Sequence, residues 1–162
     1  MISDQARVLR ELLSAEIARD VVRVDDYLSH TEIVLPSAVL FESGSARIHD
    51  SFTPVLDKIA RALERIKGDV QVEGHTDNQP INDLRYPSNW HLSLARAAEV
   101  VRYMGDVPGL ERRLLPYGRG ALEPVASNDT PAQRALNRRV VMKILHPVDT
   151  SSSALGGLEP LP

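Results

Sequence analysis

Apolar residues recur at the spacing of a helix in three stretches of the chain. In residues 54–67 they alternate with charged residues at a period near 3.6, which predicts an amphipathic helix. Pro54 suits the first turn of that helix, and Gly68 suits its end. Further helices are predicted over residues 1–20 and over residues 89–104.

Other stretches alternate between apolar and polar residues, which predicts β-strands. These stretches are residues 21–24, 31–35, 70–73, 115–117 and 140–144. The first two form a predicted hairpin. Residues 36–48 and 78–88 are predicted loops, and residues 132–137 a short helix. Because strand–helix–strand units dominate, we expect an α+β fold with helices on one face of a small mixed sheet.

The composition limits the kinds of function. A chain of 162 residues is long enough for one domain with a core. Its net charge of −3 gives no basic surplus for nucleic acid, and it has no cysteine for disulfides or thiolate metal sites. No apolar run approaches the roughly 20 residues that span a bilayer. We therefore expect membrane attachment only through a segment absent from this chain.

The chain divides into three predicted parts. Residues 1–29 supply an N-terminal helix and strand that lead into the domain, which covers residues 30–146. Residues 147–162 are rich in Ser, Gly and Pro and are predicted to form a disordered tail.

Two charged residues are the most informative positions. Asp77 closely follows the strand at residues 70–73, where loops often carry ligand groups. Gly74 is expected to let the backbone turn sharply, and the Thr76 hydroxyl to fix the Asp77 carboxylate. Arg96 lies on the next predicted helix, nearly opposite the core stripe. That stripe is predicted to contain Leu94, Ala97, Ala98, Val101 and Met104.

Opposite charges on rigid elements suit a ligand that carries both an ammonium and a carboxylate group. Each charge-assisted contact contributes about 1.5–3 kcal/mol, which supports roughly micromolar to millimolar binding. The ordinary alternatives are that Asp77 is a turn residue and that Arg96 is a solvated surface residue. The residues alone leave these alternatives open.

The sequence carries no convincing catalytic set. His75 neighbours Asp77, but strand alternation turns its side chain to the face opposite Gly74. The five histidines are scattered without metal-ligand spacing, and no nucleophile elbow or phosphate-binding loop is present. We therefore expect a binding protein rather than an enzyme, without metal or cofactor.

Four ordered motifs resemble the OmpA-like peptidoglycan-binding domain. They are FESGSA at residues 41–46, GHTD at 74–77, LSLARA at 92–97 and NRRV at 137–140. The resemblance spans about residues 30–146. It implies a βαβαβ two-layer sandwich in the periplasm that binds the diaminopimelate residue of the peptidoglycan stem peptide.

The resemblance also implies roles for individual residues. Asp77 would take the ammonium and Arg96 the carboxylate of diaminopimelate, with Asn89, Arg138 and Thr76 completing the ligand site. Two departures from the family pattern are expected to leave fewer polar groups lining this site. Gly44 stands where the family often has Asn, and Gln79 where Thr is common.

The segment RYPSNW at residues 85–90 resembles the version in two inner-membrane proteins, the type VI secretion component TssL and the flagellar stator protein MotB. The segment ASNDTP at residues 126–131 and the hairpin entry favour the type VI protein. The expected function is to anchor an envelope machine to the cell wall, with other machine subunits as partners. A MotB-type anchor, a domain that has lost its ligand, and a homo-dimer in place of a monomer remain alternatives.

Overall fold

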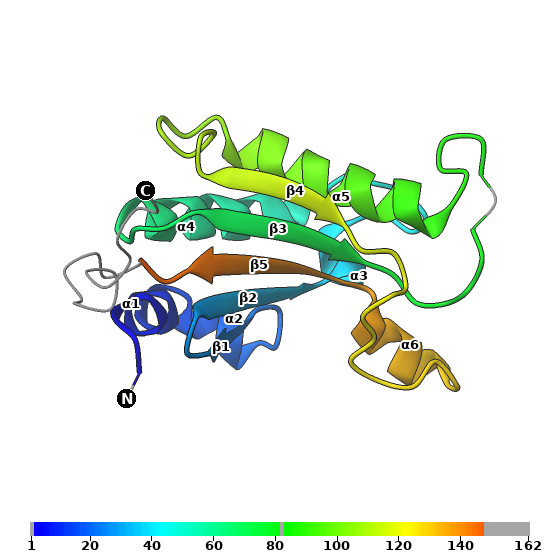
Figure 1. The fold of residues 1–162 in the computed structure, drawn as a ribbon, viewed down its shortest axis with the longest axis horizontal. Coiled ribbons are helices and arrows are strands. Elements are labelled where there is room, and N and C mark those ends of the chain that lie inside the picture. Colours follow the sequence, from blue (N-terminus) through cyan, green and yellow to red (C-terminus); the bar gives the residue numbers. More distant parts are fainter. Residues whose placement is uncertain (1, 82, 148–162) are drawn as a thin grey trace, which may run out of the picture.

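The computed structural model of the chain describes residues 2–81 and 83–147. The predicted disordered tail, apart from residue 147, lies outside these described residues. The part of the chain described contains a five-stranded mixed sheet (Figure 1). Its strands are β1 (Arg23–Asp26), β2 (His30–Pro36), β3 (Val70–His75), β4 (Leu114–Gly118) and β5 (Arg139–Leu145).

The strand order in the sheet is β1-β2-β5-β3-β4. Only β3 and β4 pair in parallel among the described strands, and the other neighbours are antiparallel. A parallel pair needs a crossover, which the helix between β3 and β4 provides. The last strand, β5, inserts between β2 and β3, so segments far apart in sequence share the centre of the sheet.

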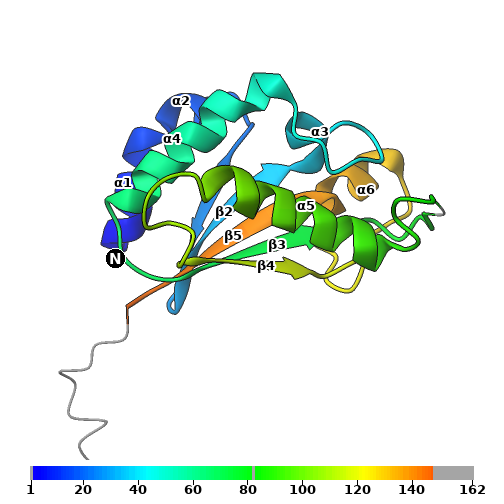
Figure 2. The ribbon, with the colours of Figure 1, turned by 90° about the horizontal axis from the view of Figure 1, so that it is seen from above.

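Six α-helices are described, together with the 3₁₀ turn η1 (Asp50–Phe52). They are α1 (Asp4–Leu12), α2 (Ser14–Ala18), α3 (Ser37–Leu40), α4 (Thr53–Glu64), α5 (Asn89–Met104) and α6 (Pro131–Asn137). Figure 2 shows α1, α2, α4 and α5 on one face of the sheet. The predicted α+β two-layer fold is confirmed.

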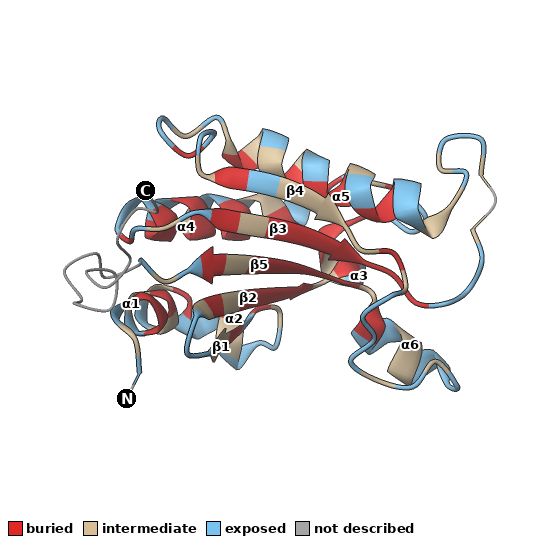
Figure 3. Ribbon diagram, viewed as in Figure 1, coloured by how far each residue is buried: buried red, intermediate tan, exposed pale blue. Residues whose placement is uncertain are grey.

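The core lies between this helical layer and the sheet (Figure 3). Helix α4 contributes Leu56, Ile59 and Leu63, as its apolar periodicity predicts. The N-terminal helix α1 contributes Leu9 to the same core. Residues of the predicted N-terminal part therefore pack into the domain rather than standing apart from it.

Three predictions of secondary structure need correction. The helix predicted over residues 1–20 is two helices, because Leu13 leaves helical geometry between them (φ −105°, ψ 16°). The loop predicted over residues 36–48 contains the four-residue helix α3. Strand β1 begins two residues later than predicted, at Arg23.

The buried face of α5 also differs from the predicted core stripe. Leu94 is 48% exposed and Ala98 is exposed, whereas Arg96 is 6% exposed. The residues of α5 that are buried are Leu92, Ser93, Arg96, Ala97, Val100 and Met104. The prediction that Arg96 points away from the core side of the helix is therefore wrong.

Helix α5 approaches β3 closely at Gly74. A Cβ atom on Gly74 would lie 2.1 Å from the backbone oxygen of Ser93 and 2.8 Å from its carbonyl carbon. Gly74 lies inside β3 and pairs with Gly118 of β4 and Val140 of β5. The expected sharp turn at Gly74 is absent, and the glycine is needed because the helix backbone occupies the space of a side chain.

Both edges of the sheet carry residues that disfavour further strand pairing. Strand β4 has Pro116 at its centre, and β1 carries the charged residues Arg23, Asp25 and Asp26. Proline and charged side chains at sheet edges hinder pairing with another chain. No helix in the described ranges has the length and hydropathy needed to cross a membrane.

We predict that Gly74→Ala destabilises the fold by about 2 kcal/mol or more, because neither the strand nor the helix backbone can move aside cheaply. Urea unfolding measures this loss. The matched control is Gly44→Ala. Gly44 has a positive φ of 63°, but no heavy atom lies within 4 Å of the position that a Cβ would take, so about 1 kcal/mol of backbone strain is expected there. An equal loss in the two variants would contradict close packing at Gly74.

Candidate functional site

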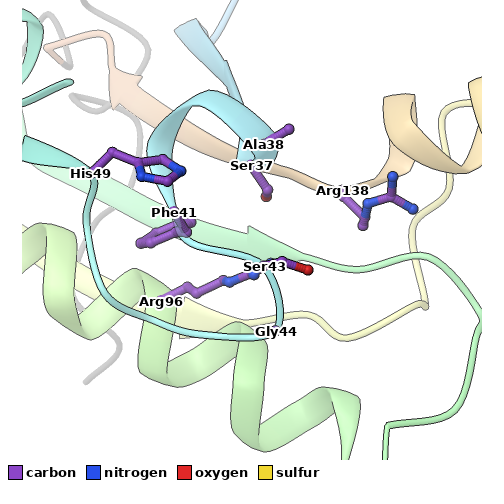
Figure 4. A pocket seen from close by; sticks show the side chains of 8 residues that line it. All are labelled: Ser37, Ala38, Phe41, Ser43, Gly44, His49, Arg96 and Arg138. Carbon is purple, nitrogen blue, oxygen red and sulfur yellow. The ribbon is translucent and has the colours of Figure 1, made fainter. Parts of the chain in front are cut away.

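A cavity of about 500 Å³ lies beside the start of β5, between α3, α5 and the loop of residues 41–49 (Figure 4). Its lining is mostly small or polar, with two arginines. The lining residues are Ser37, Ala38, Phe41, Ser43, Gly44, His49, Arg96 and Arg138. Two of the five predicted site residues, Arg96 and Arg138, line this cavity directly.

Arg96 is held in place from two sides. Its Nε donates a hydrogen bond of 2.8 Å to the backbone oxygen of Ser45, and its guanidinium carbon lies 4.9 Å from the centre of the Phe41 ring. Figure 4 shows the side chain extending from α5 toward the loop that carries Ser43. Burial lowers the pKa of Arg96 to about 10, and the charge of Arg138 acts in the same direction. A desolvated guanidinium of this kind favours a nearby anion.

Asp77 lies just beyond the end of β3 and is 7% exposed. Its Oδ2 accepts a 2.5 Å hydrogen bond from Arg138 Nη1, and its Oδ1 accepts one of 3.0 Å from the Gln79 backbone N–H. Arg138 thus connects the Asp77 carboxylate to the cavity that Arg96 also lines. The ion pair joins residues 61 positions apart in sequence.

Arg138 is itself positioned by the end of α6. Asn137 is fully buried, and its Oδ1 accepts hydrogen bonds from the backbone N–H groups of Val125 and Ala126. The backbone oxygen of Arg138 accepts a hydrogen bond from Ser37 N–H, at the start of α3. Asn137 is a positioning residue that was not predicted from the sequence, although it opens the fourth motif.

Thr76 and Asn89 stabilise the backbone around Asp77. The Thr76 hydroxyl donates to the backbone oxygen of Asp77 at 2.8 Å, so it does not fix the Asp77 carboxylate as predicted. The Asn89 side chain donates to the backbone oxygen of Gln79 at 3.0 Å and to that of Asp77 at 3.5 Å. Neither residue lines the cavity.

The loop of residues 41–49 forms one wall of the cavity. Gly44 adopts a left-handed conformation within it. The Tyr86 hydroxyl accepts a hydrogen bond of 3.2 Å from Ala46 N–H, which links this wall to the loop before α5. The position of Ser45, and with it the hydrogen bond to Arg96, therefore depends on both loops.

Ser37 and His49 line the cavity but were not predicted. The Ser37 hydroxyl oxygen is buried and has no hydrogen-bond partner among the described residues. Both residues lie in or beside the segment predicted as a plain loop, and only the unpredicted helix α3 brings Ser37 to the cavity. The sequence signal available for Ser37 was its polar side chain in the first turn of α3.

Comparison with known proteins gives the family. The model of the OmpA family matches residues 40–138. The uncharacterized protein YtxE of Bacillus subtilis is 41% identical over 121 residues, covering 74% of this chain and 50% of that protein. Motility protein B of Bacillus subtilis is 36% identical over 115 residues, covering 70% of this chain and 44% of that protein. The chain therefore spans about half the length of these curated relatives.

Solved structures share the fold. The cell wall anchor of the T6SS from Pseudomonas aeruginosa has a TM-score of 0.81 and 42% identity, over 86% of this chain and 97% of that one. A putative MotB like protein from Desulfovibrio vulgaris has a TM-score of 0.80, over 88% of this chain and 94% of that one. At 24% identity the second likeness concerns the fold alone.

These similarities agree with the sequence motifs. The T6SS neighbour is a cell wall anchor, which agrees with the prediction that the chain is not an enzyme. The family match includes β3, β4, α5 and α6, the elements that position Asp77, Arg96 and Arg138. The chain belongs to the OmpA family.

Proposed function

We propose that the chain is a non-covalent peptidoglycan-binding module that anchors an envelope machine to the cell wall. The ligand group is the diaminopimelate residue of the stem peptide. The observation that carries this proposal is the buried Arg96 in a cavity that Arg138 joins to Asp77. The free end of diaminopimelate carries one ammonium and one carboxylate, the two groups that these side chains complement.

Arg96 is the proposed carboxylate site. Its Nε is already used by Ser45, which leaves the two Nη groups to donate to a ligand. Because the guanidinium is largely removed from water, a ligand carboxylate gains more from it than from an exposed arginine. Arg138 lines the same cavity and adds a second positive charge for that carboxylate.

Asp77 is the proposed ammonium site. Arg138 neutralises its carboxylate through an ion pair. We propose that the ligand ammonium joins or replaces Arg138 at Asp77, while Arg138 turns toward the ligand carboxylate. Arg138 can move because its side chain is 38% exposed. In this scheme Thr76 and Asn89 act by holding the Asp77 backbone. The Ser37 hydroxyl, which has no hydrogen-bond partner among the described residues, is a further ligand contact.

The similar proteins support the wider assignment. The T6SS neighbour at 42% identity is a cell wall anchor, and solved MotB neighbours from Helicobacter pylori are periplasmic domains. We infer a periplasmic domain of an inner-membrane protein, with the subunits of a type VI secretion machine as partners. The alternative owner is a flagellar stator, favoured by the 36% identity to motility protein B.

We predict that Asp77→Asn and Arg96→Met each weaken binding to diaminopimelate-type peptidoglycan by about tenfold or more, because each removes a charge-assisted contact. Co-sedimentation with purified peptidoglycan measures this. Arg102→Ala is the matched control, since Arg102 lies on α5 but pairs with Glu99 at the surface. Lysine-type peptidoglycan should also bind at least about tenfold less, because lysine lacks the carboxylate assigned to Arg96. Normal binding by both site variants would refute the site.

We further predict that Gly44→Asn tightens binding of the stem peptide by about two- to tenfold, which is the gain expected from one added hydrogen bond. Asn tolerates the left-handed backbone of Gly44, and no heavy atom lies within 4 Å of the added Cβ. Gly44→Ala is the control, because it adds a Cβ atom at the same position but lacks the amide. NMR titration with a stem peptide separates the outcomes. If neither wild type nor Gly44→Asn shifts on titration, the chain is a structural domain that has lost its ligand.

A further inference from the structure

The sheet face opposite the helices carries a second polar cluster. Glu73 and His75 alternate with the core-facing residues of β3, and Glu123 reaches the same place from the loop after β4. Their potential ligand atoms all lie within 4.8 Å of one another. They line a cavity of about 210 Å³ that is separate from the Arg96 cavity.

The two strand residues of this cluster are almost completely buried and incompletely hydrogen-bonded. His75 is 2% exposed and Glu73 is 1% exposed. Among the described residues neither ring nitrogen of His75 makes a hydrogen bond, and Glu73 Oε1 makes none either; His75 Nε2 and Glu73 Oε1 lie 3.4 Å apart. Buried polar atoms normally have partners, so the His75 ring and Glu73 Oε1 are open to a ligand.

Of the described cationic side chains around Glu73, Lys143 is the one that a bound metal ion can displace. Arg119 donates to the other oxygen of Glu73, Oε2, at 2.7 Å and 3.0 Å. Arg139 donates to the backbone oxygens of Asn137 and Glu123 and is therefore committed elsewhere. Among the described lysines and arginines, only Lys143 lies near Glu73 Oε1, at 3.3 Å, and its side chain is 27% exposed.

We propose that Glu73, His75 and Glu123 bind a divalent first-row transition-metal ion of the Zn²⁺ class. One imidazole nitrogen and two carboxylate oxygens are donors that this class accepts, and water completes the coordination. The ion takes the position beside Glu73 Oε1, and the Lys143 ammonium moves to solvent on its flexible side chain. Metal binding and the Glu73–Lys143 contact therefore exclude one another. This inference does not depend on the proposed function.

The test is Zn²⁺ titration by calorimetry on tag-free protein, with Co²⁺ absorption as a second readout. Glu123→Gln and His75→Gln should each weaken Zn²⁺ binding at least tenfold. Glu123 is exposed, so its variant keeps the test valid if His75→Gln does not fold. Lys143→Gln should tighten binding several-fold, because it removes the competing ammonium. The control His91→Gln, at an exposed histidine of α5, should leave this binding unchanged.

Two results would overturn the proposal. Wild-type Zn²⁺ affinity in Glu123→Gln would mean that histidines elsewhere, on the surface, bind the metal. Unchanged or weaker affinity in Lys143→Gln would mean that the metal does not take the place of the ammonium at Glu73. A merely structural role for His75 and Glu73 predicts no gain of affinity in Lys143→Gln.

Discussion

The contact between the α5 backbone and Gly74 of β3 determines the geometry of the site. Because Ser93 lies where a side chain of residue 74 would be, the helix sits unusually close to the sheet. Arg96 follows Ser93 by three residues and is therefore buried too. It lies against the Phe41 ring and donates a hydrogen bond to Ser45 of the neighbouring loop. The Ser93 hydroxyl also accepts a hydrogen bond from Gly120 N–H, which ties the loop after β4 to the same contact. A helix one side chain farther from the sheet would leave Arg96 in solvent.

The charged residues of the site differ in whether they already have a partner of opposite charge. Arg96 is buried with no carboxylate among its described hydrogen-bond partners, whereas Asp77 is already neutralised by Arg138. This arrangement avoids an uncompensated buried carboxylate but leaves the Arg96 guanidinium without an anionic partner among the described residues. In the proposed binding scheme, a ligand with both charges would let Arg138 exchange one carboxylate partner for another. A ligand with only an ammonium would leave both arginines without an anion, so the proposed scheme favours discrimination over affinity.

The sequence predicted the fold class, the sheet strands and the position of Asp77 after β3, because these follow from local periodicity. It misjudged α5 for a physical reason. Close packing on Gly74 requires a small residue such as Ser93 on the buried face, whereas a hydrophobic pattern passes over this polar residue and selects Leu94. Arg96 was thus identified by motif and charge, with the wrong orientation. The Arg138–Asp77 ion pair and the position of α3 in the cavity wall depend on contacts between residues far apart in sequence. Local hydrophobic periodicity does not predict such contacts.

The residues at the two edges of the sheet limit how copies of the domain can associate. Pro116 in β4 and the charges of β1 oppose backbone pairing at both ends of the strand order. If the domain anchors a machine as proposed, copies crowded around it would meet through side chains, and such contacts are weaker and easier to reverse than a continuous sheet. In that role, high local concentration would multiply wall attachments through avidity without fusing neighbouring domains into a fibre.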